Sequence, residues 1–298
     1  MSHPSQIPSI RLDGRVAIVT GAGAGLGRSH ALQLAARGAQ VVVNDLGDTK
    51  AVVDEIIAAG GQAIGFSGSV TDADAMNRMV EQTMAQWGRI DILVNNAGIL
   101  RDKSFSKMTL DDFRLVVDVH LMGAVICTKA VWEIMKTQQY GRIIFTTSSS
   151  GLFGNFGQSN YGAAKMALVG LMQTLSLEGE KANIRVNCLA PTAATQMTEG
   201  ILTAEVLAQF QPERVSPGLV MLASEQAPSR AILCAGAGTF ASAHVTLTEG
   251  LYVGAREDAA DVLAEQFDQV TDRHGEVVPP YGMLQSQREL SNATNRKP

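Results

Sequence analysis

Three residues near the middle of the chain have the side chains needed to exchange a proton with an alcohol or a carbonyl. Ser148 supplies a hydroxyl, and Tyr161 and Lys165 supply a phenol and an ammonium four residues apart. In a helix, that spacing puts two side chains on one face, one turn apart. An ammonium beside a phenol favours the phenolate, and an acid/base works best when its pKa lies near the working pH. We therefore expect Tyr161 to act as an acid/base whose pKa is lowered by Lys165.

The neighbouring segments support this interpretation, because a Tyr and a Lys at helical spacing are by themselves more often surface residues. The apolar run GRIIFTT, at 141–147, predicts a buried strand that ends next to Ser148. From about Gly157 the pattern becomes helical and carries Tyr161 and Lys165. Strand and helix can thus bring the three side chains to one substrate oxygen, which predicts interconversion of a hydroxyl and a carbonyl.

A glycine-rich turn near the N-terminus indicates a dinucleotide site. It follows the apolar strand RVAIVT, at 15–20, reads GAGAGLG, and leads directly into a helical pattern. Gly21, Gly25 and Gly27 allow a tight turn, a close approach of the pyrophosphate and close packing of helix on strand. The start of the helix then offers free N–H groups to the phosphates. A merely flexible strand-to-helix turn is the alternative.

Asp45 predicts which dinucleotide is bound. It ends the strand QVVVND, at 40–45, about twenty residues after the glycine turn. A carboxylate there accepts hydrogen bonds from the adenosine ribose hydroxyls and repels a 2′-phosphate. We therefore expect NAD rather than NADP. The alternative is an aspartate that only caps a helix or lies in a loop.

Helices and strands alternate through the next part of the chain. The expected helices and strands lie at 50–59, 62–66, 72–87 and 89–94. This alternation predicts an α/β fold, a Rossmann-like doubly wound parallel sheet with helices on both faces and a ligand at the carboxyl ends of the strands. The motif NNAG follows the last of these strands. Asn95 and Asn96 can bridge loops through their amides, and Gly98 leaves room for a cofactor beside the backbone.

Composition excludes several classes of protein. The chain has 298 residues, of which 46% are hydrophobic and 18% charged, and its net charge is −5. That length suits one large α/β domain or two smaller ones, and the negative charge argues against binding nucleic acid. No apolar run approaches the roughly eighteen residues of a membrane span. Histidines are sparse and unclustered, so no metal site is expected.

The cysteines and the two termini bear on location. Cys127, Cys188 and Cys234 lie far apart in apolar segments, which predicts buried free thiols in a reducing compartment. The N-terminal residues have no signal-peptide apolar region, and the C-terminal residues SNATNRKP have no peroxisomal SKL-type address. We therefore expect a cytoplasmic protein with no membrane partner.

These motifs together resemble the short-chain dehydrogenase/reductase family. TGAGAGLG, NNAG and Ser148 with Tyr161 and Lys165 occur in the family's order and at its spacing. Within that family, GAGAGLGR, VVVNDLG, VNNAGILRD, VHL, GNFGQ and NYGAAK resemble the (3R)-hydroxyacyl-CoA dehydrogenase part of peroxisomal multifunctional enzymes of type 2. The likeness covers about 11–240, with no hydratase or sterol-carrier region after it, so a stand-alone counterpart is expected.

The resemblance implies a role for each motif residue. Tyr161 would be the acid/base, Ser148 would hydrogen-bond the substrate oxygen, and Lys165 would bind the nicotinamide ribose and support the phenolate. Ser148 is preferred to Ser149 and Ser150 because it lies thirteen residues before Tyr161, which is the family spacing. The implied cofactor site consists of Gly21, Gly25, Leu26, Gly27, Asp45, Ser69, Val70, Asn96, Ala97, Gly98, Tyr161, Lys165 and Thr195.

This chain departs from the family pattern at three positions. The family commonly has an Asn that holds a water in the proton path, where this chain has His120. His120 either maintains a relay or is a packed helix residue. The segment SGSV replaces an Asp-Val that lies against the adenine, which Ser69 can still contact. Thr192 replaces a Gly, and Thr195 is the candidate for contacting the nicotinamide amide.

A substrate lid is expected at 193–212, because this segment leaves the sheet on the cofactor side and has weak periodicity. Met197 and Leu202 either line an apolar pocket there or make ordinary packing contacts. Basic residues near the mouth of the pocket either bind CoA or belong to a solvated loop; they are Arg101, Lys103 and Lys107.

One domain is expected over 1–298, with a C-terminal part at about 240–298. The expected C-terminal elements are a last strand at 231–240, a hairpin at 242–254, a helix at 258–271, and a tail from 277 that either wraps a neighbouring subunit or remains mobile.

The helical segment after Lys165 has no charge over 166–177. An almost wholly apolar helix must be covered on more than one side, so we expect a homodimer or homotetramer, or else a fully buried helix in a monomer. The expected activity is NAD-dependent interconversion of a secondary alcohol and a ketone, with (3R)-hydroxyacyl-CoA as the leading substrate. A 17β-hydroxysteroid is the alternative substrate, and a non-catalytic NAD-binding regulator is the remote alternative.

Overall fold

The structure is a computed structural model that describes residues 9–193 and 208–295. Contacts within the chain divide it into two compact units, Met1–Ser242 and Ala243–Pro298. The division lies close to position 240, where the C-terminal part was expected to begin.

A sheet of eight strands forms the centre of the first unit. The strands are β1 (Val16–Thr20), β2 (Gln40–Asp45), β3 (Gln62–Ser67), β4 (Ile92–Asn95), β5 (Gly141–Thr146), β6 (Ile184–Thr192), β7 (Ile232–Gly236) and β8 (Thr239–Ala243). Their order is β3-β2-β1-β4-β5-β6-β7-β8, and all pairs from β3 to β7 are parallel. The order reverses between β1 and β4, which is the kind of switch point where α/β folds bind ligands.

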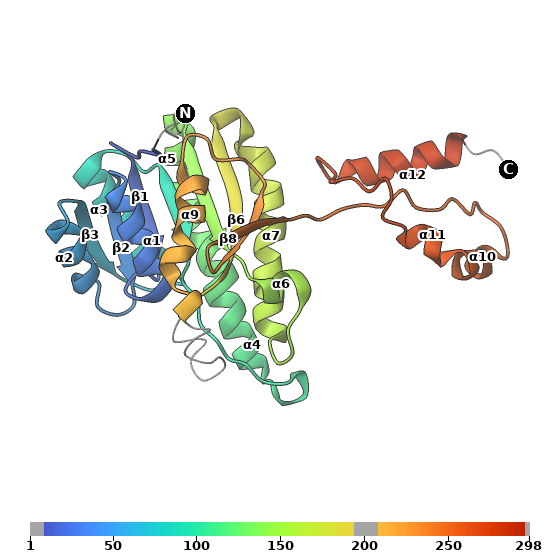
Figure 1. Ribbon diagram of the computed structural model, residues 1–298, viewed down its shortest axis with the longest axis horizontal. Helices are drawn as coiled ribbons and strands as arrows, with labels where there is room; N and C mark the ends of the chain where they lie inside the picture. The colour runs from blue at the N-terminus through green and yellow to red at the C-terminus, as the bar shows by residue number, and fades with distance from the viewer. Residues whose placement is uncertain (1–8, 194–207, 296–298) are drawn as a thin grey trace, which may run out of the picture. The chain divides into compact units, whose positions relative to one another are not determined.

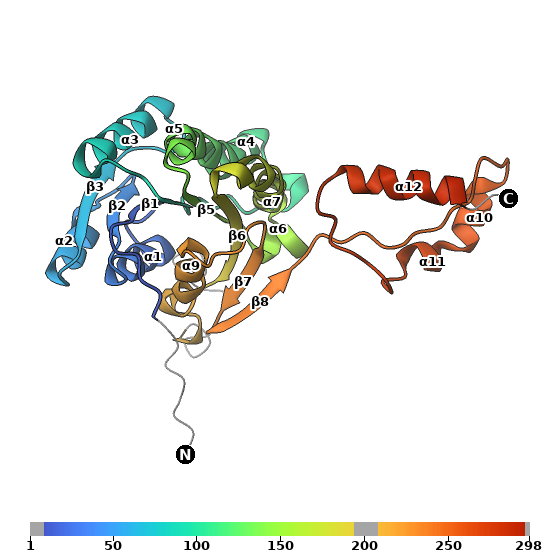
Figure 2. The same ribbon diagram turned by 90° about the horizontal axis from the view of Figure 1, so that it is seen from above.

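Helices cover both faces of the sheet. The helices of this unit are α1 (Gly25–Ala36), α2 (Lys50–Ala58), α3 (Ala73–Trp87), α4 (Leu110–Val117), α5 (Gly123–Gln138), α6 (Ser149–Phe153), α7 (Ser159–Gly179) and α9 (Ser216–Ala223). Helices α3, α5 and α7 lie over one face, and α1, α2 and α9 lie over the other (Figure 1, Figure 2). The central strands β1, β2, β4 and β5 are buried between these layers, which explains unbroken apolar runs such as VAIVT in β1. The predicted Rossmann-like α/β fold is confirmed.

One helical stretch, Leu110–Gln138, is long and apolar enough to cross a membrane by length and composition alone. It joins α4 to α5 through a π-helical turn at Asp118–Met122. In this fold α4 packs on α7, and α5 packs on α3, β4 and β5, with Cys127 and Val131 buried. These are the contacts of a core helix. Charged residues such as Lys129 interrupt the stretch, so no unbroken apolar run marks it in the sequence.

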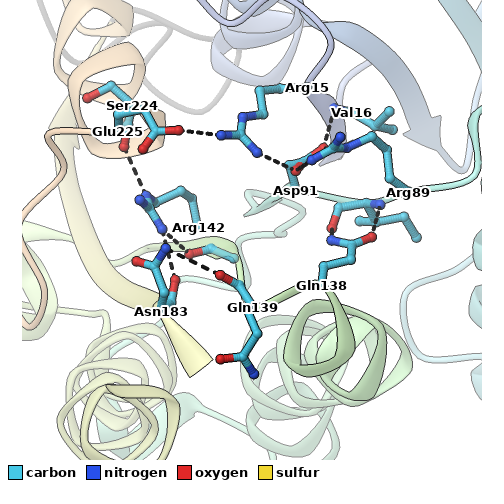
Figure 3. Close-up of polar contacts among 12 residues, drawn as sticks. Arg15, Val16, Arg89, Asp91, Gln138, Gln139, Arg142, Asn183, Ser224 and Glu225 are labelled. Carbon is cyan, nitrogen blue, oxygen red and sulfur yellow. Dashed lines mark hydrogen bonds and ion pairs between the residues drawn. The ribbon is translucent and has the colours of Figure 1, made fainter. Parts of the chain in front are cut away.

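A network of ion pairs and hydrogen bonds joins the amino ends of the strands (Figure 3). Asp91, just before β4, is fully buried and accepts hydrogen bonds from the Val16 backbone at 2.9 Å, from Arg15 at 3.0 Å and from Arg89 at 2.6 Å. Arg142, in β5, is also fully buried and donates to the backbone carbonyl of Ser224 at 2.9 Å. We call these residues the amino-end network, and it ties β1, β4 and β5 to the end of α9.

The expected last strand is two strands. Strands β7 and β8 are joined by Ala237 and Gly238, which have φ values of 49° and 76°. Positive φ at both central residues is typical of a type I′ turn, the turn that favours hairpins. The glycine-rich sequence at 235–238 is therefore a hairpin turn. The expectation of one strand over 231–240 was therefore wrong.

The second unit differs from its predicted structure. The expected hairpin at 242–254 is absent from the described residues, and Leu247 instead makes an antiparallel bridge with Val277. The expected helix at 258–271 is interrupted at Gln266, and the expected tail contains a helix. The helices of this unit are α10 (Ala259–Glu265), α11 (Phe267–Thr271) and α12 (Met283–Asn295). None of the residues described from 243 to 294 is buried, so periodic apolar patterning gave little guidance here.

Candidate active site

A pocket of about 690 Å³ opens at the carboxyl ends of the strands. Its lining includes the glycine loop after β1, the ends of β2 and β4, and the three residues expected to do chemistry. Of the predicted site, the structure brings together Gly21, Gly25, Leu26, Gly27, Asp45, Ser69, Val70, Asn96, Ala97, Gly98, Ser148, Tyr161 and Lys165 around this pocket. Thr195 and most of the expected lid, including Met197 and Leu202, lie outside the described residues.

The glycine loop has the close contacts that a dinucleotide loop needs. Gly21 has a φ of 62°, and a Cβ atom there would lie 2.8 Å from the Cα of Ala97. A Cβ atom on Gly27 would lie 2.1 Å from the carbonyl oxygen of Gly21. Helix α1 starts at Gly25, and among the described residues no side chain caps it. Its first N–H groups are therefore available to an anionic group such as a pyrophosphate.

Asp45 lies at the end of β2 and holds two loops together. Its Oδ2 accepts a hydrogen bond from the Gly23 N–H at 2.9 Å, and its Oδ1 accepts one from the Gly47 N–H at 3.0 Å. A carboxylate has about four acceptor positions, so it can still accept bonds from ribose hydroxyls. Leu46 lines the pocket next to Asp45 and is 75% exposed. Leu46 was not among the predicted site residues. Its position as an exposed apolar residue directly after the acidic end of β2 could have indicated it.

Asn96 braces the glycine loop from the neighbouring strand. Its side-chain amide donates to the carbonyl oxygens of Thr20 at 3.0 Å and Gly21 at 3.1 Å. The amide of Asn95 donates to Thr128 Oγ1 at 3.2 Å. The prediction that both amides bridge separate segments is confirmed. The bonds of Asn96 join the end of β4 to the end of β1, and the bond of Asn95 joins β4 to α5.

The catalytic candidates come from the strand and the helix that the sequence predicts, β5 and α7, with the short helix α6 between them. Ser148 follows β5 and caps α6, where its Oγ accepts the Ser150 N–H at 3.1 Å. Tyr161 and Lys165 lie one turn apart on α7 and face the same pocket. The Lys165 ammonium nitrogen is 5.5 Å from the centre of the Tyr161 ring and donates to the Thr146 carbonyl at 2.5 Å.

Burial is the main cause of the pKa shifts of Lys165 and Tyr161. It lowers the pKa of Lys165 to about 7, because an ammonium loses its hydration there. Burial also raises the pKa of Tyr161, and a hydrogen bond with Ser148 acts in the opposite direction. The expected lowering of the Tyr161 pKa by Lys165 is therefore not found in the protein alone. The Lys165 ammonium is directed at a backbone carbonyl, and the phenol is removed from water.

His120 stands on the π-helical turn and packs against Tyr161. The two rings are perpendicular with centres 5.1 Å apart. His120 Nε2 lies 2.7 Å from the Ile99 carbonyl oxygen, and burial lowers the pKa of this imidazole to about 3. A Cβ atom on Gly98 would lie 2.3 Å from the His120 ring. Gly98 therefore makes room for His120 as well as for a ligand. A relay through His120 stays a prediction, and its packing contacts are observed.

The part of the pocket next to Ser148 and Tyr161 contains residues that the sequence analysis did not single out. They are Ile99, Leu100, Asp102, Ser150, Asn155 and Gln158. Gln158 precedes Tyr161 by one helical turn, and this spacing could have identified it. None of the basic residues considered for CoA, Arg101, Lys103 and Lys107, lines the described pocket. Lys103 is paired with Asp112 at 2.8 Å.

The described residues fit a nicotinamide dinucleotide and give no sign of a metal site. The crowded glycine loop, the uncapped start of α1 and the acidic end of β2 form one continuous lining. When bound, a nicotinamide cofactor accepts or donates the hydride of the reaction. No group of three or more metal-binding side chains occurs in the part of the chain that the structure describes.

Comparison with known proteins identifies the family. A family model described as short chain dehydrogenase matches residues 15–205. The chain is 51% identical over 227 residues to peroxisomal multifunctional enzyme type 2 of Drosophila melanogaster, which covers 72% of this chain and 38% of that enzyme. The solved structure of the full-length Drosophila enzyme matches 96% of this chain with a TM-score of 0.82 and 39% identity, and the match covers 50% of that chain. The resemblance to type 2 multifunctional enzymes is thus confirmed.

Two further relatives resemble most of the chain. A putative short-chain type dehydrogenase/reductase of Mycobacterium tuberculosis is 42% identical over 273 residues, covering 88% of this chain and 95% of that protein. A 7α-hydroxysteroid dehydrogenase, solved with NADH and 7-oxo glycochenodeoxycholic acid, matches 76% of this chain and 95% of its own with a TM-score of 0.71 and 31% identity. The chain belongs to the short-chain dehydrogenase family and is an oxidoreductase that binds a nicotinamide cofactor.

Proposed function

We propose that this protein oxidises (3R)-hydroxyacyl-CoA to 3-ketoacyl-CoA with NAD. The observation that carries this proposal is a single pocket that contains Ser148, Tyr161 and Lys165 together with the glycine loop and Asp45. The relatives named as multifunctional enzymes favour an acyl-CoA substrate. The chain spans between a quarter and two-fifths of the length of several such relatives, so their complete activities are not transferred to it.

The chemistry of the proposed reaction follows from the positions of the three side chains. Ser148 donates a hydrogen bond to the substrate oxygen, and Tyr161 removes the hydroxyl proton as the carbonyl forms. A nicotinamide cofactor held by the glycine loop and Asp45 would accept the hydride from the same carbon. Lys165 would bind the nicotinamide ribose and support the phenolate once the cofactor is in place, since in the protein alone its ammonium donates to the Thr146 carbonyl. In the reverse direction Tyr161 returns the proton to the carbonyl oxygen.

Asp45 supports NAD as the cofactor. Its carboxylate faces the pocket beside Gly23, where an adenosine ribose would lie. A 2′-phosphate would place additional negative charge against this carboxylate. Lys165 is the one lysine, and no arginine occurs, among the described residues that line the pocket. A 2′-phosphate would therefore meet no arginine there.

A 17β-hydroxysteroid is the second candidate substrate. The likeness to a hydroxysteroid dehydrogenase solved with a bile acid derivative favours a hydroxysteroid class. A non-catalytic NAD-binding regulator is the third, remote candidate. It would need no serine, tyrosine and lysine gathered at one pocket, so the arrangement of these side chains argues against it.

The proposal includes a homodimer or homotetramer in the cytoplasm, with no nucleic acid or membrane as partner. Helix α7 is not fully buried within one chain, since Met166 is 40% exposed and Leu177 is 45% exposed. Covering these apolar side chains favours association of subunits. Free buried thiols at Cys127 and Cys188 suit a reducing compartment. Light scattering after size-exclusion chromatography would determine the number of subunits.

NADH production distinguishes the candidate substrates. Purified protein and NAD are mixed in parallel with (3R)-hydroxyacyl-CoA, its 3S epimer and a 17β-hydroxysteroid. We expect turnover of the 3R thioester alone. Turnover of the steroid alone would replace the acyl-CoA proposal with the steroid proposal, and NAD binding without turnover of any substrate would support a regulator.

A further inference from the structure

Three polar residues form a hydrogen-bonded chain along the wall of the pocket next to Tyr161. The Asn155 amide donates to Gln158 Oε1 at 3.1 Å, and the Gln158 amide donates to Asp102 Oδ2 at 2.6 Å. All three residues line the same pocket as Ser148 and Tyr161. We call Asp102, Asn155 and Gln158 the amide strip. It is a polar wall on the part of the pocket that no cofactor motif accounts for.

Backbone contacts fix the position of the amide strip. The Lys103 N–H donates to the Gly157 carbonyl at 2.9 Å, and the Asn160 side chain, which is fully buried, donates to the Arg101 carbonyl at 3.1 Å. The loop that carries Asp102 is therefore tied to the loop that carries Asn155 and Gln158. A polar wall held in this way is ordered before substrate binds, which reduces the cost of recognition.

Gln158 precedes the proposed acid/base by three residues and lines the same pocket. It is the residue before the first turn of α7, and Tyr161 follows one turn later. Side chains with this spacing at a helix start are neighbours. In a 3-hydroxyacyl thioester, the thioester carbonyl is two carbons from the carbon that is oxidised. Because Gln158 and Tyr161 line the same pocket, this carbonyl is the substrate group that the Gln158 amide would meet.

The charge of the pocket favours a neutral group at this point. Asp102 is the one ionisable residue of the amide strip. No arginine lines the pocket in the described parts of the chain. A free 3-hydroxy acid would bring a carboxylate toward Asp102, and no arginine in the described lining would pair with it. A thioester carbonyl is neutral, and the amide groups beyond it in an acyl-CoA can bond to Asn155.

We propose that the amide strip recognises the acyl thioester, with the Gln158 amide bound to the thioester carbonyl and Asn155 and Asp102 holding Gln158 in place. This inference rests on the proposed function and specifies how one substrate class is selected. A steroid offers hydrocarbon where the amide strip lies, so binding it would take these polar groups out of water without offering the Gln158 amide an acceptor. The same loss applies to a simple ketone that lacks the thioester.

The test compares the wild-type protein with Gln158→Leu on two ketones in the reducing direction, with NADH. One substrate is acetoacetyl-CoA, which has the thioester carbonyl, and the other is 2-pentanone, which lacks it. We expect Gln158→Leu to lower kcat/KM for acetoacetyl-CoA roughly 10-fold to 100-fold, mainly through KM, because a bond to the bound substrate is lost. The value for 2-pentanone should change less than about threefold, since that ketone makes no such bond.

Matched variants separate recognition from damage to α7. Gln62→Leu changes an exposed glutamine outside the pocket and should have no effect on either ketone. Gln158→Glu keeps the length of the side chain and places a second carboxylate beside Asp102, so it should weaken acetoacetyl-CoA binding as well. Melting temperature and NADH affinity should match those of the wild type in all three variants.

The outcomes distinguish this inference from the proposed function. If the wild type reduces no acyl thioester, the proposed function fails. If the wild type reduces acetoacetyl-CoA and Gln158→Leu retains its KM, the proposed function stands and the role of the amide strip is wrong. An equal loss on both ketones would show that Gln158 only positions Tyr161, which also contradicts the inference.

Discussion

Polar groups gather at both ends of the same parallel sheet, and the two ends use them differently. At the amino ends, the Asp91 carboxylate is fully buried and accepts bonds from one backbone N–H and two arginines. At the carboxyl ends, Lys165 is almost fully buried and donates to the Thr146 carbonyl, with no carboxylate paired to it among the described residues. The Asp91 carboxylate has partners on both oxygens. The group at the carboxyl ends keeps capacity for a ligand.

The difference follows from the chemistry that each end performs. Removing one partner from a buried ionic network destabilises the native structure, because the remaining groups are left without compensation. A site that must bind a substrate and a cofactor needs donors and acceptors that the folded protein does not already satisfy. Such a site costs stability, so substitutions at the two ends should have opposite consequences for activity and stability.

Tyr161→Phe should produce the largest effect on activity. The change removes one oxygen atom and keeps the ring that packs against His120. We expect turnover to fall by about 10²-fold to 10⁴-fold, the usual contribution of a positioned acid/base. NAD affinity and melting temperature should remain near those of the wild type. Steady-state kinetics and cofactor titration measure the two quantities, and turnover that survives the change would contradict the assignment of Tyr161 as the acid/base.

Asp91→Ala should produce the largest effect on stability. The change leaves the buried Val16 N–H and two arginines without their shared acceptor. We expect the free energy of unfolding to fall by about 2–4 kcal/mol, with turnover per folded molecule unchanged. Urea denaturation measures the first quantity. Asp54→Ala, which removes an exposed ion pair with Lys50, is the control and should change stability by less than about 1 kcal/mol. Equal losses in the two variants would contradict a special role of the amino-end network.

The motif residues and central strands could be predicted because their signals are local. The run VAIVT, the glycine loop and Asp45 follow each other in the sequence, and β1, α1 and β2 form where these patterns predict them. The spacing of Tyr161 and Lys165 likewise puts them on one face of α7. Each of these features depends on neighbours along the chain.

The remaining features depend on partners that are distant in sequence. Asp91 and Arg142 form a network only because parallel pairing brings β1, β4 and β5 together. Gln158 donates a hydrogen bond to Asp102, which is 56 residues away in the sequence. Nothing in the spacing of these two residues predicts that their loops meet. The pKa of Tyr161 was expected to fall and instead is raised, because the depth of burial cannot be read from the YxxxK spacing. The hairpin expected at 242–254 was also wrong. None of the described residues from 243 to 294 is buried, so apolar patterning gives little guidance there.

Lys165→Met should increase stability while abolishing efficient turnover. Burial lowers the pKa of Lys165 to about 7, so between about pH 7 and pH 10 the folded protein binds fewer protons than the unfolded chain. The penalty for burying this ammonium is complete below pH 7 and declines as the pH rises toward 10. We expect Lys165→Met to raise the free energy of unfolding by about 1–3 kcal/mol at pH 6, where the ammonium is charged in both states.

The pH dependence is the decisive part of this prediction. The advantage of Lys165→Met should shrink at pH 7.5 and shrink further at pH 9 in urea denaturation. Arg142→Met, at the amino ends of the strands, is the comparison, because its guanidinium donates to the backbone carbonyls of Gly141, Asn183 and Ser224. It should destabilise the protein at all three pH values. A destabilised Lys165→Met protein at pH 6 would contradict the view that the catalytic end of the sheet costs stability.

Asp45→Asn should produce the smallest effect, because Asp45 combines features of both ends of the sheet. Its carboxylate bonds to Gly23 and Gly47 as a structural acceptor and also faces the pocket. Asparagine keeps one acceptor oxygen and removes the charge. We expect the ratio of kcat/KM for NAD to that for NADP to fall roughly 10-fold, as repulsion of the 2′-phosphate is lost.

Asp45→Ala separates the charge of Asp45 from its hydrogen bonds. Alanine removes the acceptor as well, so the loops at Gly23 and Gly47 lose the group that joins them. NAD affinity should then fall below that of Asp45→Asn, while the preference between the two cofactors should be similar in both variants. Parallel titrations with NAD and NADP measure both quantities. Equal use of the two cofactors by the wild type would contradict NAD selection by Asp45, and equal NAD affinity in the two variants would show that the loops keep their shape without it.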